Sequence, residues 1–122
     1  MAPKLTGEQM RRVEELGAFQ RSVDHLKHLV TELEANRAGH TRTIQQLCER
    51  IANEASQMRQ RALTTNVGTL ADIAGAMSVM AGRGGGVLMK IRGLADSVNS
   101  LTMQLDIAMK HATAPPEPKP PT

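Results

Sequence analysis

The chain has 122 residues, of which 40% are hydrophobic, and a formal net charge of +3 from fifteen Lys and Arg against twelve Asp and Glu. The length is that of one domain, and the charge is too small by itself to demand a nucleic-acid partner. Phe19 is the only aromatic residue, so the ring surfaces that dominate tight ligand pockets are nearly absent. The composition therefore argues against a pocket enzyme and favours long aliphatic helices.

The cellular setting is suggested by the cysteine count and by the first residues. Cys48 is the single cysteine and cannot form an intramolecular disulfide, while residues 1–10 lack the apolar core of a secretory signal. Charged residues interrupt the only long apolar stretch, residues 68–93, so it does not reach the roughly 18 apolar residues of a spanning helix. We expect an intracellular, cytoplasmic protein.

A flexible N-terminus, residues 1–6, precedes the first predicted element, a long helix from residue 7 to about residue 63. Thr6 suits the N-cap position, and Gln9 three residues later completes a capping box. From Val23 onward the apolar residues alternate steps of three and four, which is the heptad pattern of a coiled coil. This pattern predicts one helical face that packs against another helix.

Two features test the continuity of this helix. Gly39 weakens it by about 1 kcal/mol relative to Ala. The heptad phase nevertheless continues across residues 38–41, which favours one long helix over a turn. In that register Arg37 and His40 occupy core positions a and d, where a polar group costs stability but selects register and partner. His40 there would also make the seam sensitive to acid. The alternative, which the neighbouring Gly39 favours, is that the helix is frayed or solvated at this point.

The remainder of residues 7–112 completes a single helical domain. Residues 64–66 predict a kink or short loop before a helix over 67–81, and the four glycines within 82–86 predict a turn. A return helix over 87–112 is expected to fold back antiparallel on residues 55–81. Residues 113–122 are rich in proline and predict a disordered tail, whose PxxP spacing leaves docking to a partner open.

The fold class expected is thus all-α: an elongated coiled coil or helical hairpin with a Pro-rich C-terminal tail. β-branched residues at a with Leu at d favour a parallel dimer, so a homodimer is the first expectation. The flanking e and g positions weaken this expectation, because they carry no complementary charges and include Leu29, Cys48, Ala55 and Ala62, which widen the apolar stripe towards bundle packing. The predicted assembly seam consists of Val23, Leu26, Val30, Leu33, Ile44, Leu47, Ile51, Met58, Ile91, Leu94, Val98, Leu101 and Leu105, with Arg37 and His40 as its polar members.

A second candidate surface is basic. Residues 55–95 contain five basic residues and only Asp72 as an acid. The candidate anion-binding residues are Arg59, Arg61, Arg83, Lys90 and Arg92. Their cationic side chains suit a membrane surface with anionic lipids or a nucleic acid.

Other patterns predict no chemistry. The glycines of residues 82–86 lack the GxxxxGK order of a phosphate loop. His25, His28 and Glu32 have metal-ligand spacing, but the heptad register places them on the solvated face without a fourth ligand. Cys48 is expected to be a small packing residue. We therefore expect no catalytic, cofactor or metal site.

Residues 64–95 resemble the cytoplasmic signalling hairpin of bacterial chemoreceptors in three elements: Thr65-Asn66, residues 81–84 (AGRG) and residues 91–95 (IRGLA). The resemblance implies an antiparallel helical hairpin. The acidic and aromatic residues of that tip are missing, so kinase control is carried over to no residue here.

The function expected from the sequence is that of a non-catalytic coiled-coil adaptor, or of a subunit in a helical assembly. Its partners would be itself, as a homo-oligomer, or other helical proteins. The alternative is a peripheral binder of an anionic surface, membrane lipid or nucleic acid, through the basic, glycine-rich residues 59–92.

Overall fold

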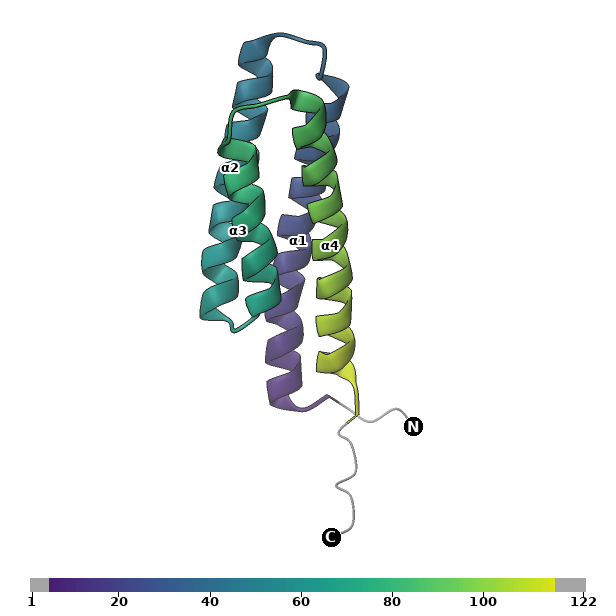
Figure 1. Cartoon of the computed structure of the whole chain (residues 1–122). Coiled ribbons are helices and arrows are strands. Elements are labelled where there is room, and N and C mark those ends of the chain that lie inside the picture. Colours follow the sequence, from purple (N-terminus) through teal and green to yellow (C-terminus); the bar gives the residue numbers. More distant parts are fainter. Residues whose placement is uncertain (1–4, 116–122) are drawn as a thin grey trace.

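The computed structural model describes residues 5–115, which form four helices: α1 (Gly7–Ala35), α2 (Thr41–Thr64), α3 (Gly68–Gly82) and α4 (Val87–Thr113) (Figure 1). Successive helices run in opposite directions along a rod. Each packs on its neighbours in sequence, and α1 packs on α4 to close the bundle. The all-α fold class predicted from the sequence is confirmed, as an up-and-down four-helix bundle.

The start of α1 follows the predicted capping box. The Thr6 hydroxyl accepts a hydrogen bond from the Gln9 backbone N–H at 3.1 Å, and the Gln9 side-chain oxygen accepts one from the Thr6 N–H at 2.9 Å. Two backbone donors that the first helical turn cannot satisfy internally are thereby satisfied. The flexible N-terminus predicted for residues 1–6 falls mostly outside the described residues, as does the Pro-rich tail beyond residue 115.

The prediction of one helix from residue 7 to about residue 63 is wrong, because the chain reverses direction at residues 36–40. Asn36 closes α1, since both its backbone N–H and its side-chain amide donate to the Glu32 carbonyl, at 3.0 and 2.8 Å. The Gly39 N–H then donates to the Asn36 carbonyl at 2.8 Å. These bonds stabilise a tight connection where the heptad phase had favoured a continuous helix.

Arg37 and His40 consequently lie exposed in this connection and are not seam residues. A periodic pattern alone could not reveal this, because the stripes of α1 and α2 are both aligned on one core. The connection is five residues long, and with this length the heptad phase of α2 continues that of α1. Folding back lets the two helices bury their stripes against one another within a single chain.

The connection between α2 and α3 lies at residues 65–67, where the sequence predicted a kink or loop. Asn66 has a positive φ of 58°, a conformation that Asn adopts more readily than most residues. The guanidinium of Arg12 donates to the carbonyls of Thr65 and Asn66. This contact ties the connection to α1.

α3 and α4 have bounds within one residue of those predicted, and residues 83–86 connect them. α4 packs on α3 and α1, whereas within residues 5–115 its backbone does not come close to that of α2. The expectation that the return helix folds back on all of residues 55–81 is therefore wrong for the α2 part. α2 sits diagonally opposite α4 because the α1–α2 reversal places α1 beside it.

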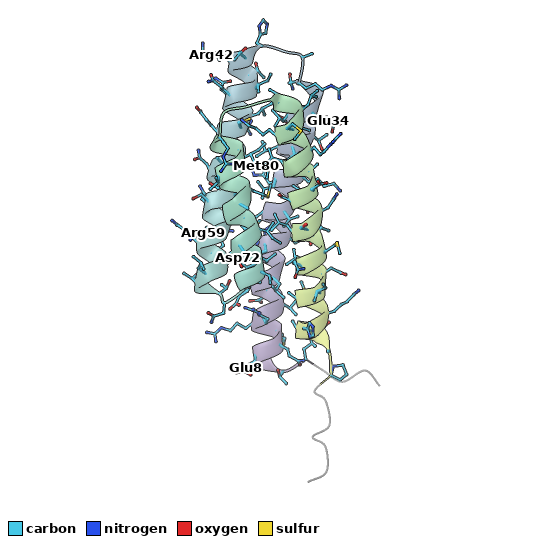
Figure 2. All side chains as sticks on the ribbon, in the orientation of Figure 1. Glu8, Glu34, Arg42, Arg59, Asp72 and Met80 are labelled. Atoms are coloured by element: carbon cyan, nitrogen blue, oxygen red, sulfur yellow. The ribbon has the colours of Figure 1, made fainter. Side chains whose placement is uncertain are left out.

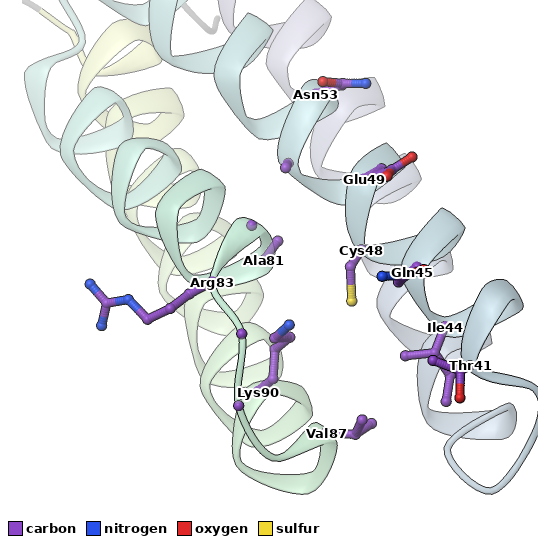
Figure 3. Close-up of a pocket in the computed structure, with 14 residues that line it drawn as sticks. Thr41, Ile44, Gln45, Cys48, Glu49, Asn53, Ala81, Arg83, Val87 and Lys90 are labelled. Carbon is purple, nitrogen blue, oxygen red and sulfur yellow. The ribbon is translucent and has the colours of Figure 1, made fainter.

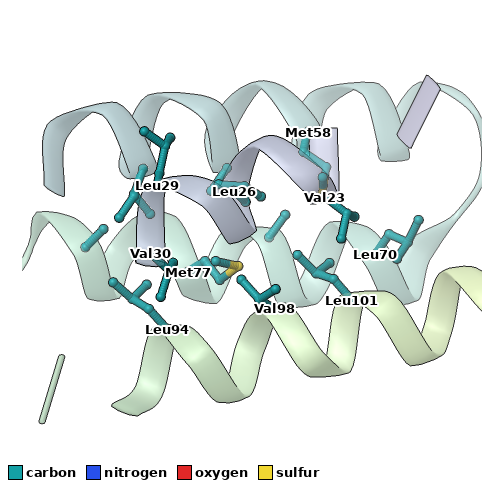
Figure 4. Close-up of a cluster of buried hydrophobic side chains, with 14 of the residues drawn as sticks. Val23, Leu26, Leu29, Val30, Met58, Leu70, Met77, Leu94, Val98 and Leu101 are labelled. Carbon is teal, nitrogen blue, oxygen red and sulfur yellow. The ribbon is translucent and has the colours of Figure 1, made fainter. Parts of the chain in front are cut away.

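The core runs along the axis of the rod and is aliphatic apart from Phe19 and a few sulfur-containing side chains (Figure 4). All the apolar residues of the predicted assembly seam are buried in it except Ile44, which is half-buried. Leu26, Leu33, Ile51, Leu94 and Leu101 are each 0% exposed. The seam residues of α1 and α2, which were expected to join two chains, thus pack within one chain, and those of α4 dock the return helix on the same core.

The glycine connection contains one position that requires glycine. Gly85 has φ +130°, which L side chains rarely adopt, whereas Gly84 has ordinary backbone angles and open space where a Cβ would lie. Gly85→Ala is therefore expected to lower the free energy of unfolding by about 1–3 kcal/mol. Gly84→Ala, measured by the same urea titration, is the control. Equal effects of the two substitutions would contradict this account of the turn.

Candidate functional site

A hollow of about 540 Å³ lies between the N-terminal half of α2 and the glycine connection (Figure 3). Thr41, Ile44, Cys48 and Glu49 line it from α2. The opposite wall consists of the end of α3, residues 83–85 of the connection, and the start of α4 with Lys90. The hollow exists because α3 ends early and the glycines have no side chains to fill the space.

Cys48 forms part of the floor of this hollow and is 6% exposed. Burial raises the pKa of its thiol above the ordinary value of 9.0, and the positive charge of Lys90 opposes that rise. The thiol is accordingly neutral near pH 7 and lacks the thiolate character of a reactive cysteine.

A second hollow of about 300 Å³ lies on the other side of the same connection. Its apolar lining includes Met80 and Met89, and its charged lining is Arg83 and Lys90. Gly93 makes this packing feasible, because a Cβ at that position would lie 2.5 Å from the Met80 sulfur. The glycine connection is therefore flanked by two hollows that share the same two cations.

The five candidate anion-binding residues are not brought together. Arg83 and Lys90 line both hollows. The Arg59 side chain lies against Gly75 of α3 (Figure 2), and a Cβ added to Gly75 would be 3.1 Å from the Arg59 Cδ. Arg61 donates to the Ser22 hydroxyl on α1 at 3.4 Å. Arg92 is exposed on α4. The structure thus supports a pair of cations at the connection and leaves the other three apart from it.

The two histidines of the α1 pattern lie beside carboxylates of glutamate residues. His28 lies 2.8 Å from the Glu32 carboxylate, and His25 lies 3.5 Å from Glu54 on α2. Both histidines are exposed, as the sequence predicted from their heptad positions. Over residues 5–115 no group of three or more His, Cys, Asp or Glu side chains is placed to hold a metal ion.

The sequence analysis missed the outer face of α4. The described part of the chain has seven large hydrophobic residues that are substantially exposed, and four of them are on this helix. They are Leu88 at 68%, Met89 at 74%, Met103 at 63% and Ile107 at 45% exposed. Hydrophobic periodicity offered no signal for them, because positions 88, 89, 103 and 107 are separated by one, fourteen and four residues.

Comparison with known proteins gave no matching family model, curated protein or solved structure. Within the described residues, none of the helices is long and apolar enough to cross a membrane.

The raised pKa of Cys48 is testable by following thiolate absorbance during an alkaline titration. The folded chain is expected to titrate above 9.0. Lys90→Met should raise the pKa further because it removes the cation that stabilises the thiolate, and Arg92→Met is the matched control.

Because the folded thiol keeps its proton to higher pH than the unfolded thiol, the free energy of unfolding should fall as the pH rises above 9.0. Cys48→Ala should remove this part of the pH dependence. A folded pKa at or below the unfolded value would contradict the assignment.

Proposed function

We propose that the chain is a non-catalytic helical module that acts through helix–helix association, as an adaptor or as one subunit of a helical assembly. The observation that carries the proposal is the outer face of α4, which exposes Leu88, Met89, Met103 and Ile107. These side chains form two groups, at residues 88–89 and at residues 103 and 107, and exposed apolar groups on a helix are typical of a surface that is covered by a partner.

The closed core leaves the outer surface of the bundle as the surface through which the chain can associate. The apolar stripes of all four helices pack on one another within the chain, so they are not available to a second protein. Association that leaves the bundle intact must therefore use its outer surface. Such a module would work in the cytoplasm, the setting expected from a single thiol kept reduced.

The non-catalytic part of the proposal is supported by the contents of the hollows. The only nucleophilic thiol there, Cys48, is neutral near pH 7, and neither hollow is lined by a histidine that could act as its base. Glu49, which lines the larger hollow, is exposed.

The proposal is tested by capture from an extract of the cells that produce the chain. The immobilised native chain is compared with the double variant Met103→Glu/Ile107→Glu, which places two charges on the outer face of α4. Leu63→Glu is the control, because Leu63 is a large hydrophobic residue on α2 that is 52% exposed. Native chain and control should retain the same proteins, including further copies of the chain, and the double variant should lose them. Identical sets from all three would contradict the proposal, provided that circular dichroism shows equal helicity.

A second candidate function, binding to an anionic surface, is favoured by one specific observation. Arg83 and Lys90 line both hollows, and residues 73–95 around them contain no acidic residue. The exposed Leu88 and Met89 beside this pair suit contact with a lipid layer. Phosphates of lipid headgroups or of a nucleic acid are equally suitable for these two cations.

This second function predicts binding to anionic vesicles or to duplex DNA that weakens steeply as the salt concentration rises. The double variant Arg83→Gln/Lys90→Gln should lose most of that binding. The matched control Arg59→Gln/Arg61→Gln removes the same charge from α2 and should retain it. Equal losses in the two double variants would attribute binding to net charge and would contradict a site at the glycine connection.

A further inference from the structure

The outer face of α4 carries a second regular stripe, separate from the buried one. Its positions alternate steps of three and four, and every one of them is exposed: Met89, Arg92, Asp96, Asn99, Met103, Asp106 and Lys110. The stripe spans 21 residue steps, which at 1.5 Å per residue is about 30 Å. A straight helical seam of this length matches the geometry of an antiparallel or parallel helix pair.

Two apolar residues belong to the stripe, Met89 and Met103, and two more lie beside it, Leu88 and Ile107. Leu88 and Met89 lie at the start of α4, and Met103 and Ile107 lie about four to five turns further along. The middle is polar, with Asp96 and Asn99. The apolar residues thus lie on both sides of a polar centre. A second copy in antiparallel orientation would place its residues 103 and 107 near residues 88–89 of the first copy.

The charges of the stripe determine which kind of partner it fits. Arg92 and Lys110 are mixed with Asp96 and Asp106. Anionic lipid or nucleic acid would be repelled by the two carboxylates, whereas a protein surface of the same mixed charge would not. Arg92 makes none of the ion pairs found among the described residues.

Asp106 has a partner within its own helix, the Lys110 ammonium at 3.1 Å. The two side chains are 63% and 77% exposed, and exposed pairs of this kind contribute little to stability. The pair therefore does not prevent Asp106 from accepting hydrogen bonds from an arginine of another molecule.

We propose, on the basis of the function proposed above, that α4 pairs with α4 of a second copy in antiparallel orientation, about a two-fold axis near Asp96 and Asn99. This arrangement sets Leu88 and Met89 of one copy level with Asp106 and Ile107 of the other. It also brings Arg92 within one helical turn of Asp106 of the second copy, and the symmetry forms this contact twice.

Charge selects this orientation. Parallel pairing would set Arg92 against Arg92 and Asp106 against Asp106, and like charges directly opposed destabilise a helix pair. The antiparallel pair brings the two Asp96 carboxylates near each other at its centre. Arg92, one turn away on the same helix, offsets that repulsion.

The experiment is a charge exchange on the purified full-length chain, with the dimer dissociation constant measured by sedimentation equilibrium from about 1 µM to about 1 mM. The native chain should dimerise within that range. Arg92→Asp alone and Asp106→Arg alone should each weaken the dimer about ten-fold or more, because each sets like charges opposite one another. The combined variant Arg92→Asp/Asp106→Arg should restore the affinity to near the native value. Arg42→Asp on α2 is the control and should leave it unchanged.

Three results would overturn the proposal: a native chain that stays monomeric throughout, single variants that dimerise as well as or better than the native chain, or a combined variant that is not restored. Circular dichroism must show equal helicity in all variants. A monomeric pure chain that still captures other proteins from an extract through α4 would reject the second copy while the function proposed above survives.

Discussion

The reversal of the chain at residues 36–40 is the constraint on which the rest of the structure depends. It sends α2 back along α1, so that the aliphatic stripes of both helices face one core and α4 can pack beside α1. Without it the long stripe of residues 16–63 would need a second chain to cover it. The hydrogen bonds of Asn36 and Gly39 thus decide that the core is intramolecular and that association must use the outer surface.

The features that could be predicted from the sequence are those that a few adjacent residues determine. The Thr6–Gln9 capping box and the glycine connection follow from a few adjacent residues, and both lie where they were expected. The turn after Asn36 has a weak local signal, and the heptad phase argued against it. Periodicity reports which residues are buried, as Leu26 and Leu101 show, but it does not report which helix covers them.

The candidate sites were harder to predict for the same reason. Arg83 and Lys90 are seven residues apart in sequence, and only the length of α3 places both beside Cys48. Arg59 and Arg61 belonged to the same basic segment, yet the fold uses them in contacts with α3 and α1. The exposed hydrophobic residues of α4 have no such signal, since only Met89 and Met103 interrupt an outer face that is otherwise polar and reads as an ordinary solvated surface.

The bond between the Gln9 side chain and the Ala114 carbonyl, 2.9 Å long, joins residues that are 105 positions apart. Closing so large a loop costs more chain entropy than forming the α2–α3 hairpin across its three-residue connection. We therefore expect the hairpin to assemble early and the α1–α4 pairing to be established late. α4, the helix that carries the outer stripe, is thus one partner in the helix pairing that we expect to form last. A protein bound to α4 would therefore bind a helix that has only then packed on α1.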